Sequence, residues 1–201
     1  LESWATGNGY TVERQYIDDH RWNLFINWVK HVDVALSTHI DVVPPYFPAR
    51  IDGNTIYGRG ACDTKGIIAS MLIAGDRLKR EGYAPSYLFL VGEEVDSIGA
   101  KEAARSGKTA AYIVNGEPTN NRIVAGHKGS LGYQLTVKGR IAHSGYPHLG
   151  IDAAATLLDI LSEIREQDWG FSDLFGHATT NIGTVEAGRA MNVVPDKATA
   201  T

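Results

Sequence analysis

The stretch Val32–Pro44, VDVALSTHIDVVP, passes directly from a β-rich run to polar residues. The run Val32–Thr38 predicts a strand. His39 and Asp41 follow it two residues apart, so in an extended chain both side chains point to the same face. A carboxylate beside an imidazole accepts its second N–H and leaves the other nitrogen free for a metal. The alternative is a loop histidine with an ordinary hydrogen bond.

Similar β-rich runs lie on both sides of this stretch, and segments with helical spacing of apolar residues separate them. The further predicted strands are Tyr10–Ile17, Thr55–Tyr57, Tyr87–Val91 and Ala111–Val114. The predicted helices are Thr64–Glu81 and Ile98–Arg105. Strands that alternate with helices predict an α/β fold with a mostly parallel sheet and flanking helices.

The pattern changes after about Val124. Strands are predicted over Ser130–Lys138 and Asn181–Glu186, with a further one from Val193, and a helix is predicted over Gly150–Glu166. This order is typical of a small α+β domain. We therefore expect a first domain over residues 1–125 and part of a second over residues 126–201.

Composition limits the function classes. The 201 residues carry a net charge of −4, and 43% of them are hydrophobic, which is ordinary for a globular protein. Lysine and arginine are scattered, and no long apolar run occurs, so we expect no nucleic-acid partner and no membrane span. Cys62 is the only cysteine, which excludes an internal disulfide and a thiolate metal site and leaves the compartment open. The two ends, without an initial methionine and with a strand-like last stretch, favour a piece of a longer chain.

Carboxylates follow three other predicted strand or turn segments. Asp63 lies in Gly58–Gly66, GRGACDTKG, directly before a predicted helix, where an ordinary helix cap is the alternative. Glu93 and Glu94 follow an apolar strand, and two adjacent carboxylates there need a positive partner unless the turn is simply solvated. Glu117 follows the next strand in the same way.

His39, Asp63, Glu94 and Glu117 therefore come from four separate strand ends or turns. In an open α/β sheet the carboxyl ends of the strands share one crevice, where ligands bind. One imidazole and several carboxylates, without thiolates, suit zinc or a similar divalent ion in an open catalytic site.

Four motifs in this order and spacing resemble the dinuclear zinc aminopeptidase-like hydrolases of clan MH. The motifs are STHIDVVP at residues 37–44, GRGACDTKG at 58–66, GEE at 92–94 and GEPT at 116–119. The family includes glutamate carboxypeptidase, acetylornithine deacetylase, succinyl-diaminopimelate desuccinylase and aminoacylase. The chain is most similar to fungal secreted carboxypeptidase-like members, which favours export.

The resemblance implies a role for each matched residue of the first domain. His39 and Glu117 would bind one zinc ion, Glu94 would bind the second, and Asp63 would bridge the two; Co²⁺ or Mn²⁺ are alternatives to zinc. Asp41 would orient His39, and Glu93 would be the general base. The family's last zinc ligand, a histidine near the C-terminus, has no match among these residues, so the chain alone is expected to bind metal weakly or be inactive.

The second domain resembles the ferredoxin-like lid and dimerisation domain of this family. His143, in GRIAHSGYPH at residues 139–148, would reach the active site of a partner subunit and stabilise the oxyanion, and Asn192 would contact substrate. The resemblance implies a homodimer that hydrolyses an amide bond in a small peptide or an N-acyl amino acid. The alternative is a binding or dimerisation module that retains the fold without catalysis.

Overall fold

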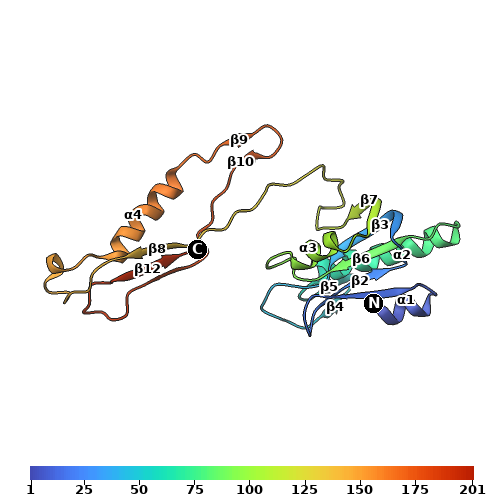
Figure 1. Cartoon of the computed structure of the whole chain (residues 1–201), viewed down its shortest axis with the longest axis horizontal. Helices are drawn as coiled ribbons and strands as arrows, with labels where there is room; N and C mark the ends of the chain where they lie inside the picture. Colours follow the sequence, from blue (N-terminus) through green and yellow to red (C-terminus); the bar gives the residue numbers. More distant parts are fainter. The chain divides into compact units, whose positions relative to one another are not determined.

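Figure 1 shows the computed structural model of the chain, which describes every residue from Leu1 to Thr201. Contacts divide the chain into two units, Leu1–Ile123 and Val124–Thr201. The first unit consists of α1 (Glu2–Gly7), β1 (Val12–Tyr16), β2 (Trp22–Ile26), β3 (His31–His39), β4 (Arg50–Asp52), β5 (Thr55–Tyr57), the irregular helical turn η1 (Ala61–Gly66), α2 (Ile67–Arg80), β6 (Ser86–Leu90), α3 (Ile98–Arg105) and β7 (Thr109–Asn115).

The first unit is built on a five-stranded sheet with the order β1-β2-β6-β3-β7. β3 pairs in parallel with β6 and β7, whereas β1–β2 and β2–β6 are antiparallel. The predicted α/β class is confirmed, but the sheet is mixed where a mostly parallel one was expected. The reason is β2, which the sequence did not predict: a short turn joins it to β1, and a short turn can join only antiparallel strands.

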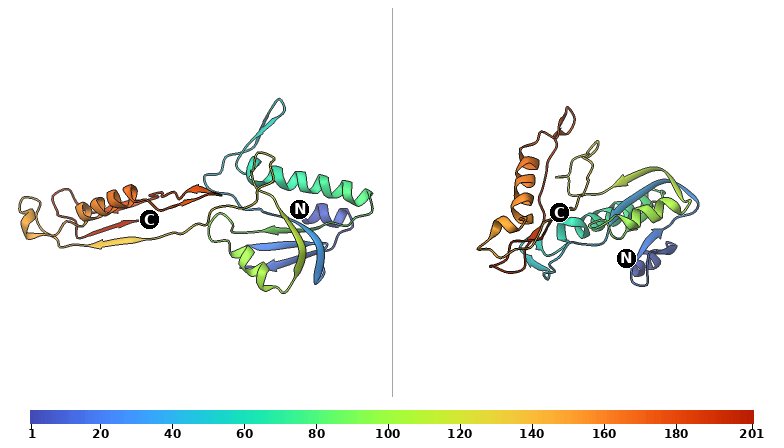
Figure 2. Two further views of the ribbon diagram at one scale, coloured as in Figure 1. Left: turned by 90° about the horizontal axis from the view of Figure 1, so that it is seen from above. Right: turned by 60° about the vertical axis from the view of Figure 1, so that its left-hand side comes forward.

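The strands alternate apolar side chains between two faces, and each face has its own helix. Leu24, Leu36 and Phe89 lie in one cluster with Ile68 and Met71 of α2. Phe25, Ala35 and Leu88, one position along each strand, lie in a second cluster with Ala103 of α3. Figure 2 shows α2 and α3 on opposite sides of the sheet. This two-sided burial fixes the register of the central strands.

The parallel register aligns the carboxyl ends of three strands. His39 of β3 lies opposite Leu90 of β6, and Ser37 lies opposite Asn115 of β7. Ile40 N donates to Leu90 O at 2.8 Å, so β3 and β6 stay together for one more residue. The polar segments that follow these strands therefore start side by side, as the sequence predicted.

The second unit is a small α+β arrangement. Its elements are β8 (Leu135–Lys138), the short helix η2 (Pro147–Leu149), α4 (Ala153–Glu166), β9 (Phe171–Ser172), β10 (Gly176–His177), β11 (Val185–Ala187) and β12 (Lys197–Ala200). β11, β12 and β8 form an antiparallel sheet in that order. Leu157 and Leu161 of α4 pack on Ala198 and Ala200 of β12.

Several predicted boundaries in this unit were wrong. Val193 begins no strand; it forms an isolated bridge with His143, and β12 begins only at Lys197, after Pro195, which has no N–H for a ladder. The strand expected from Ser130 begins at Leu135, after Gly132.

No helix of either unit combines the length and the apolar character that a membrane crossing requires.

Candidate metal centre

His39 is the centre of a polar cluster at the end of β3. Its ring is buried, with 2% of the residue exposed. Nδ1 lies 3.0 Å from the main-chain oxygen of Asp41, which can only accept, so Nδ1 is the protonated nitrogen of this pair. The Asp41 carboxylate is farther from Nδ1, at 3.5 Å. This arrangement directs Nε2 toward the other carboxylates.

Asp63 reaches His39 from the turn η1. Gly60 begins the turn with a φ of +79°, and Asp63 itself has extended dihedrals of φ −112° and ψ 94° inside it. Asp63 Oδ1 lies 2.8 Å from His39 Nε2. The helix that follows begins after Gly66 and has no side-chain cap. The alternative that Asp63 is an ordinary helix cap is therefore wrong.

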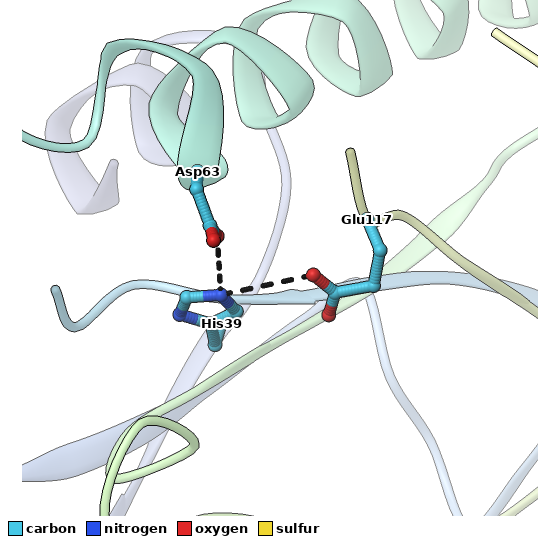
Figure 3. A group of neighbouring side chains, drawn as sticks. All are labelled: His39, Asp63 and Glu117. Atoms are coloured by element: carbon cyan, nitrogen blue, oxygen red, sulfur yellow. Dashed lines mark hydrogen bonds and ion pairs between the residues drawn. The ribbon is translucent and has the colours of Figure 1, made fainter. Parts of the chain in front are cut away.

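Glu117 and Glu93 approach the same nitrogen. Glu117 Oε2 and Glu93 Oε2 each lie 3.9 Å from His39 Nε2. One ligand atom from each of His39, Asp63 and Glu117 lies within 4.8 Å of the others. Figure 3 shows these three side chains, from β3, η1 and the segment after β7, converging on one point.

Glu94 is the one expected metal ligand of the first unit whose carboxylate is outside this group. Its main-chain N–H donates to Asp41 Oδ2 at 3.2 Å, and the N–H of Glu93 donates to Asp41 Oδ1 at 3.2 Å. Both glutamates therefore share a turn that is fixed to the end of β3. Within that turn, Glu93 is the residue whose carboxylate faces His39.

The cluster changes the acidity of two of its members. Burial lowers the pKa of His39, but the carboxylates of Glu117, Asp63 and Glu93 more than offset this and hold it above its ordinary value. Burial raises the pKa of Glu117, and the neighbouring carboxylates of Glu93 and Asp63 raise it further against the opposing effect of His39. Three acids thus concentrate negative charge around one imidazole, which favours a cation.

The residues fit a divalent metal. Nitrogen and oxygen ligands lie about 2.0–2.2 Å from a zinc ion, so two of them lie at most about 4.4 Å apart. The Nε2–Oδ1 and Nε2–Oε2 distances in the His39–Asp63–Glu117 group, 2.8 and 3.9 Å, are within this limit. Imidazole nitrogen and carboxylate oxygen are ligands that zinc, cobalt and manganese accept. The Nδ1 hydrogen bond to a main-chain carbonyl is the usual support for a metal-binding histidine.

The two expected site residues of the second unit lie together. Ser144 N, next to His143, donates to Asn192 O at 3.0 Å, and His143 is bridged to Val193. His143 Nδ1 accepts from Gly145 N at 3.0 Å, which leaves Nε2 as the free nitrogen. The chain therefore places His143 and Asn192 on neighbouring loop segments of one surface.

Two supporting residues were not predicted from the sequence. Thr64, next to Asp63, is buried, and its hydroxyl donates to the main-chain oxygen of His39. Asn23 in β2 is fully buried and holds the main chain before Glu93. The only sequence signal for Thr64 is its position after Asp63, and Asn23 gives none because its main-chain partners, Val91 and Gly99, lie far along the chain.

Comparison with known proteins shows that the chain is similar to proteins named as peptidases and carboxypeptidases. Residues 125–201 match the family model of the peptidase dimerisation domain. A peptidase M20 domain-containing protein of Schizosaccharomyces pombe is 37% identical, over 100% of this chain and 52% of that protein. A probable carboxypeptidase of Aspergillus clavatus is 36% identical, over 95% of this chain and 52% of that protein. The chain spans about half the length of these curated relatives.

Solved structures share the fold. A tripeptidase from Staphylococcus aureus aligns with a TM-score of 0.71 at 21% identity, over 100% of this chain and 57% of that one. An M20 family metallo-carboxypeptidase from Sulfolobus solfataricus aligns with a TM-score of 0.55 at 14% identity, over 98% of this chain and 64% of that one. At these identities the likeness concerns the fold.

Proposed function

The chain is related along its whole length to peptidases of the M20 family, and on this premise we propose that the full-length protein is a metal-dependent hydrolase of amide bonds in small peptides or N-acyl amino acids. One observation carries the proposal. Three ligand-type side chains, His39, Asp63 and Glu117, meet at one point, and a fourth carboxylate, that of Glu93, lies 3.9 Å from the same His39 nitrogen.

In this proposal His39, Asp63 and Glu117 would hold the first metal ion, and Asp63 with Glu94 would hold the second. When bound, two divalent zinc ions would polarise the scissile carbonyl and lower the pKa of water. Asp63 is suited to bridging because its Oδ1 is already directed at the cluster while half of the side chain, 47%, stays exposed.

Glu93 is the proposed general base. Its carboxylate is 48% exposed, so a water and a substrate can reach it, and it faces the cluster without being part of the three-residue ligand group. From this position Glu93 takes the proton of the attacking water and passes it to the leaving amine. General acid–base catalysis by such a group contributes about 10²–10⁴-fold to the rate.

His143 and Asn192 are proposed to act on the substrate from the second unit. The free Nε2 of His143 provides a donor for the oxyanion, an effect worth about 3 kcal/mol for one donor. The match of residues 125–201 to a peptidase dimerisation domain supports a homodimer. In that dimer we propose that His143 serves the partner's site.

The second candidate is a binding or dimerisation module without catalysis. Hydrolysis of a panel of dipeptides and N-acyl amino acids by the full-length protein, with and without added zinc, separates the two. We expect zinc-dependent release of a free amino acid from at least one substrate. A rate no higher than that of zinc alone for every substrate would contradict the hydrolase and favour the module.

A further inference from the structure

We propose that the Asp41 carboxylate, besides lying next to the imidazole of His39, is a positioning group for the Glu93–Glu94 turn and therefore for the general base. The proposal rests on the proposed function for the role of Glu93. The contact that carries it, between the Asp41 side chain and the main chain of the turn, is independent of that function.

The hydrogen bonds of Asp41 divide between its main chain and its side chain. The main-chain oxygen lies 3.0 Å from His39 Nδ1 and already satisfies that nitrogen. The two carboxylate oxygens go to the turn, Oδ1 to Glu93 N and Oδ2 to Glu94 N, each at 3.2 Å. The carboxylate is 3.5 Å from Nδ1, too long for a good hydrogen bond. The imidazole would therefore keep its partner if the carboxylate were lost, whereas the turn would not.

The parallel register explains why Asp41 faces this turn. β3 and β6 are neighbours, and Ile40 N still pairs with Leu90 O beyond the end of β3. Gly92 then turns the chain out of β6 with a φ of +74°. The N–H groups of Glu93 and Glu94 have left the ladder, and Asp41 is the residue beside them that accepts both. A carboxylate that accepts main-chain N–H groups forms stronger hydrogen bonds than a neutral acceptor.

A second buried residue fixes the other side of Gly92. Asn23 is 0% exposed, and its Oδ1 accepts from Val91 N at 3.1 Å while its Nδ2 donates to Gly99 O at 2.8 Å. Gly99 N in turn donates to Val91 O at 3.0 Å. The chain before Gly92 is thus held by neutral contacts. After Gly92, Asp96 N and Ser97 N close the turn by donating to Gly92 O, and Asp41 provides the second attachment by accepting from Glu93 N and Glu94 N. The position of the Glu93 carboxylate relative to His39 depends on that second attachment.

Amide hydrogen exchange of the zinc-loaded full-length protein tests the contact directly. We expect the Glu93 and Glu94 amides to be protected in the wild type and to exchange at least about tenfold faster in Asp41→Asn, which keeps the side-chain shape but only one acceptor oxygen. The matched control is Asp168→Asn, because Asp168 also accepts a main-chain N–H, from Gly170, in an exposed turn of the second unit. This control should leave residues 91–97 unchanged.

Zinc content and kinetics distinguish the two roles of Asp41. We expect Asp41→Asn to retain the zinc ion proposed for His39, Asp63 and Glu117, which lie outside the turn, and to lower kcat about tenfold or more, with KM within about twofold, because the turn that carries the base is displaced. A fall in zinc affinity, with unchanged exchange at Glu93 and Glu94, would show that Asp41 acts only through His39 and would overturn the proposal.

Failure of the two proposals can be told apart. If the wild type hydrolyses no substrate, the proposed function fails, while the exchange and zinc measurements still decide the role of Asp41. If Asp41→Asn does not fold, the wild type alone decides: unprotected Glu93 and Glu94 amides in the folded protein would overturn the positioning role, and protected ones support it.

Discussion

His39 Nε2 and Asp63 Oδ1 lie 2.8 Å apart although they are 24 residues apart in the chain. Two features of the fold bring these atoms together. The end of β3 is buried and fixes the imidazole, and the turn that begins at Gly60 before α2 places the Asp63 side chain beside it. The pair gives the cluster a preformed nitrogen and oxygen ligand, and it is the contact on which metal binding should depend most.

Asp63→Asn should therefore weaken zinc binding by the full-length protein by about 100-fold or more. An amide lacks the charge of the carboxylate and offers one oxygen, so it cannot bridge two cations; even residues that only support a ligand cost about 10–100-fold. Calorimetric titration with zinc measures the change. Asp52→Asn, on the exposed β4–β5 hairpin, is the matched control, and equal affinities of the two variants would argue against Asp63 as a ligand.

Gly75 should be intolerant of a side chain. A Cβ at this position of α2 would lie 1.7 Å from the Tyr87 hydroxyl oxygen. Glycine to alanine in a helix normally stabilises by up to about 1 kcal/mol, but here we expect Gly75→Ala to lower the free energy of unfolding by about 1–3 kcal/mol. Denaturant unfolding checks it. Tyr87→Phe in the same chain should restore part of the loss; a stable Gly75→Ala single variant would contradict the packing.

Two buried tyrosines should limit stability at high pH. Burial raises the pKa of Tyr87 and of Tyr10 above the ordinary tyrosine value. A raised pKa means that the neutral form is favoured in the folded state, so this stabilisation is complete below about pH 10 and declines as the pH rises above it. The expected loss from Tyr87 is about 1 kcal/mol at one pH unit above 10, and Tyr10 adds to it in the same direction.

Denaturant unfolding between pH 8 and 11.5 measures this decline, and Tyr87→Phe removes one of the two groups. The variant should lose stability less steeply than the wild type above pH 10. Tyr112→Phe, at an exposed position of β7, is the control and should follow the wild type. Identical slopes for all three proteins would show that the Tyr87 hydroxyl titrates freely in the folded state.

The helix of the second unit should depend on its cap. Asp152 Oδ1 accepts from Ala154 N at 2.8 Å and from Ala155 N at 3.0 Å. Asp152→Ala should cost about 1 kcal/mol of helix stability, whereas Asp152→Ser, which retains an acceptor, should cost less. Circular dichroism and unfolding of residues 124–201 within the full-length protein check this order. Equal losses for both variants would mean that the capping contact contributes nothing.

Sequence patterns predicted those elements whose signals are local. The helix Ile98–Arg105 and the strand Thr55–Tyr57 have the predicted bounds. His39, Asp63, Glu93 and Glu117 were predicted because each follows a strong strand or turn signal. The parallel register of β3, β6 and β7 brings His39, Glu93 and Glu117 to one end of the sheet, and the turn η1 adds Asp63.

The missed features depend on contacts between distant residues. β2 was missed because WNLFI includes a polar residue, Asn23, whose burial makes sense only with its partner Gly99, 76 residues away. The contacts of Asp41, whose main chain faces His39 and whose carboxylate accepts from Glu93 and Glu94, could not be predicted either, because Glu93 and Glu94 lie far along the chain. A strand was expected from Val193, but Pro195 has no N–H for a ladder, and β12 begins only at Lys197.

The most direct test of the central claim is the comparison of Glu93→Gln with the wild type in the full-length protein, by turnover of a cleaved dipeptide and by zinc content. Glu81→Gln, an exposed glutamate at the end of α2, is the matched control. We predict that Glu93→Gln keeps the wild-type zinc content and loses about 10²-fold or more of its turnover, while Glu81→Gln keeps both. Undiminished turnover in Glu93→Gln, or loss of its zinc, would contradict Glu93 as the base of a metal-dependent hydrolase.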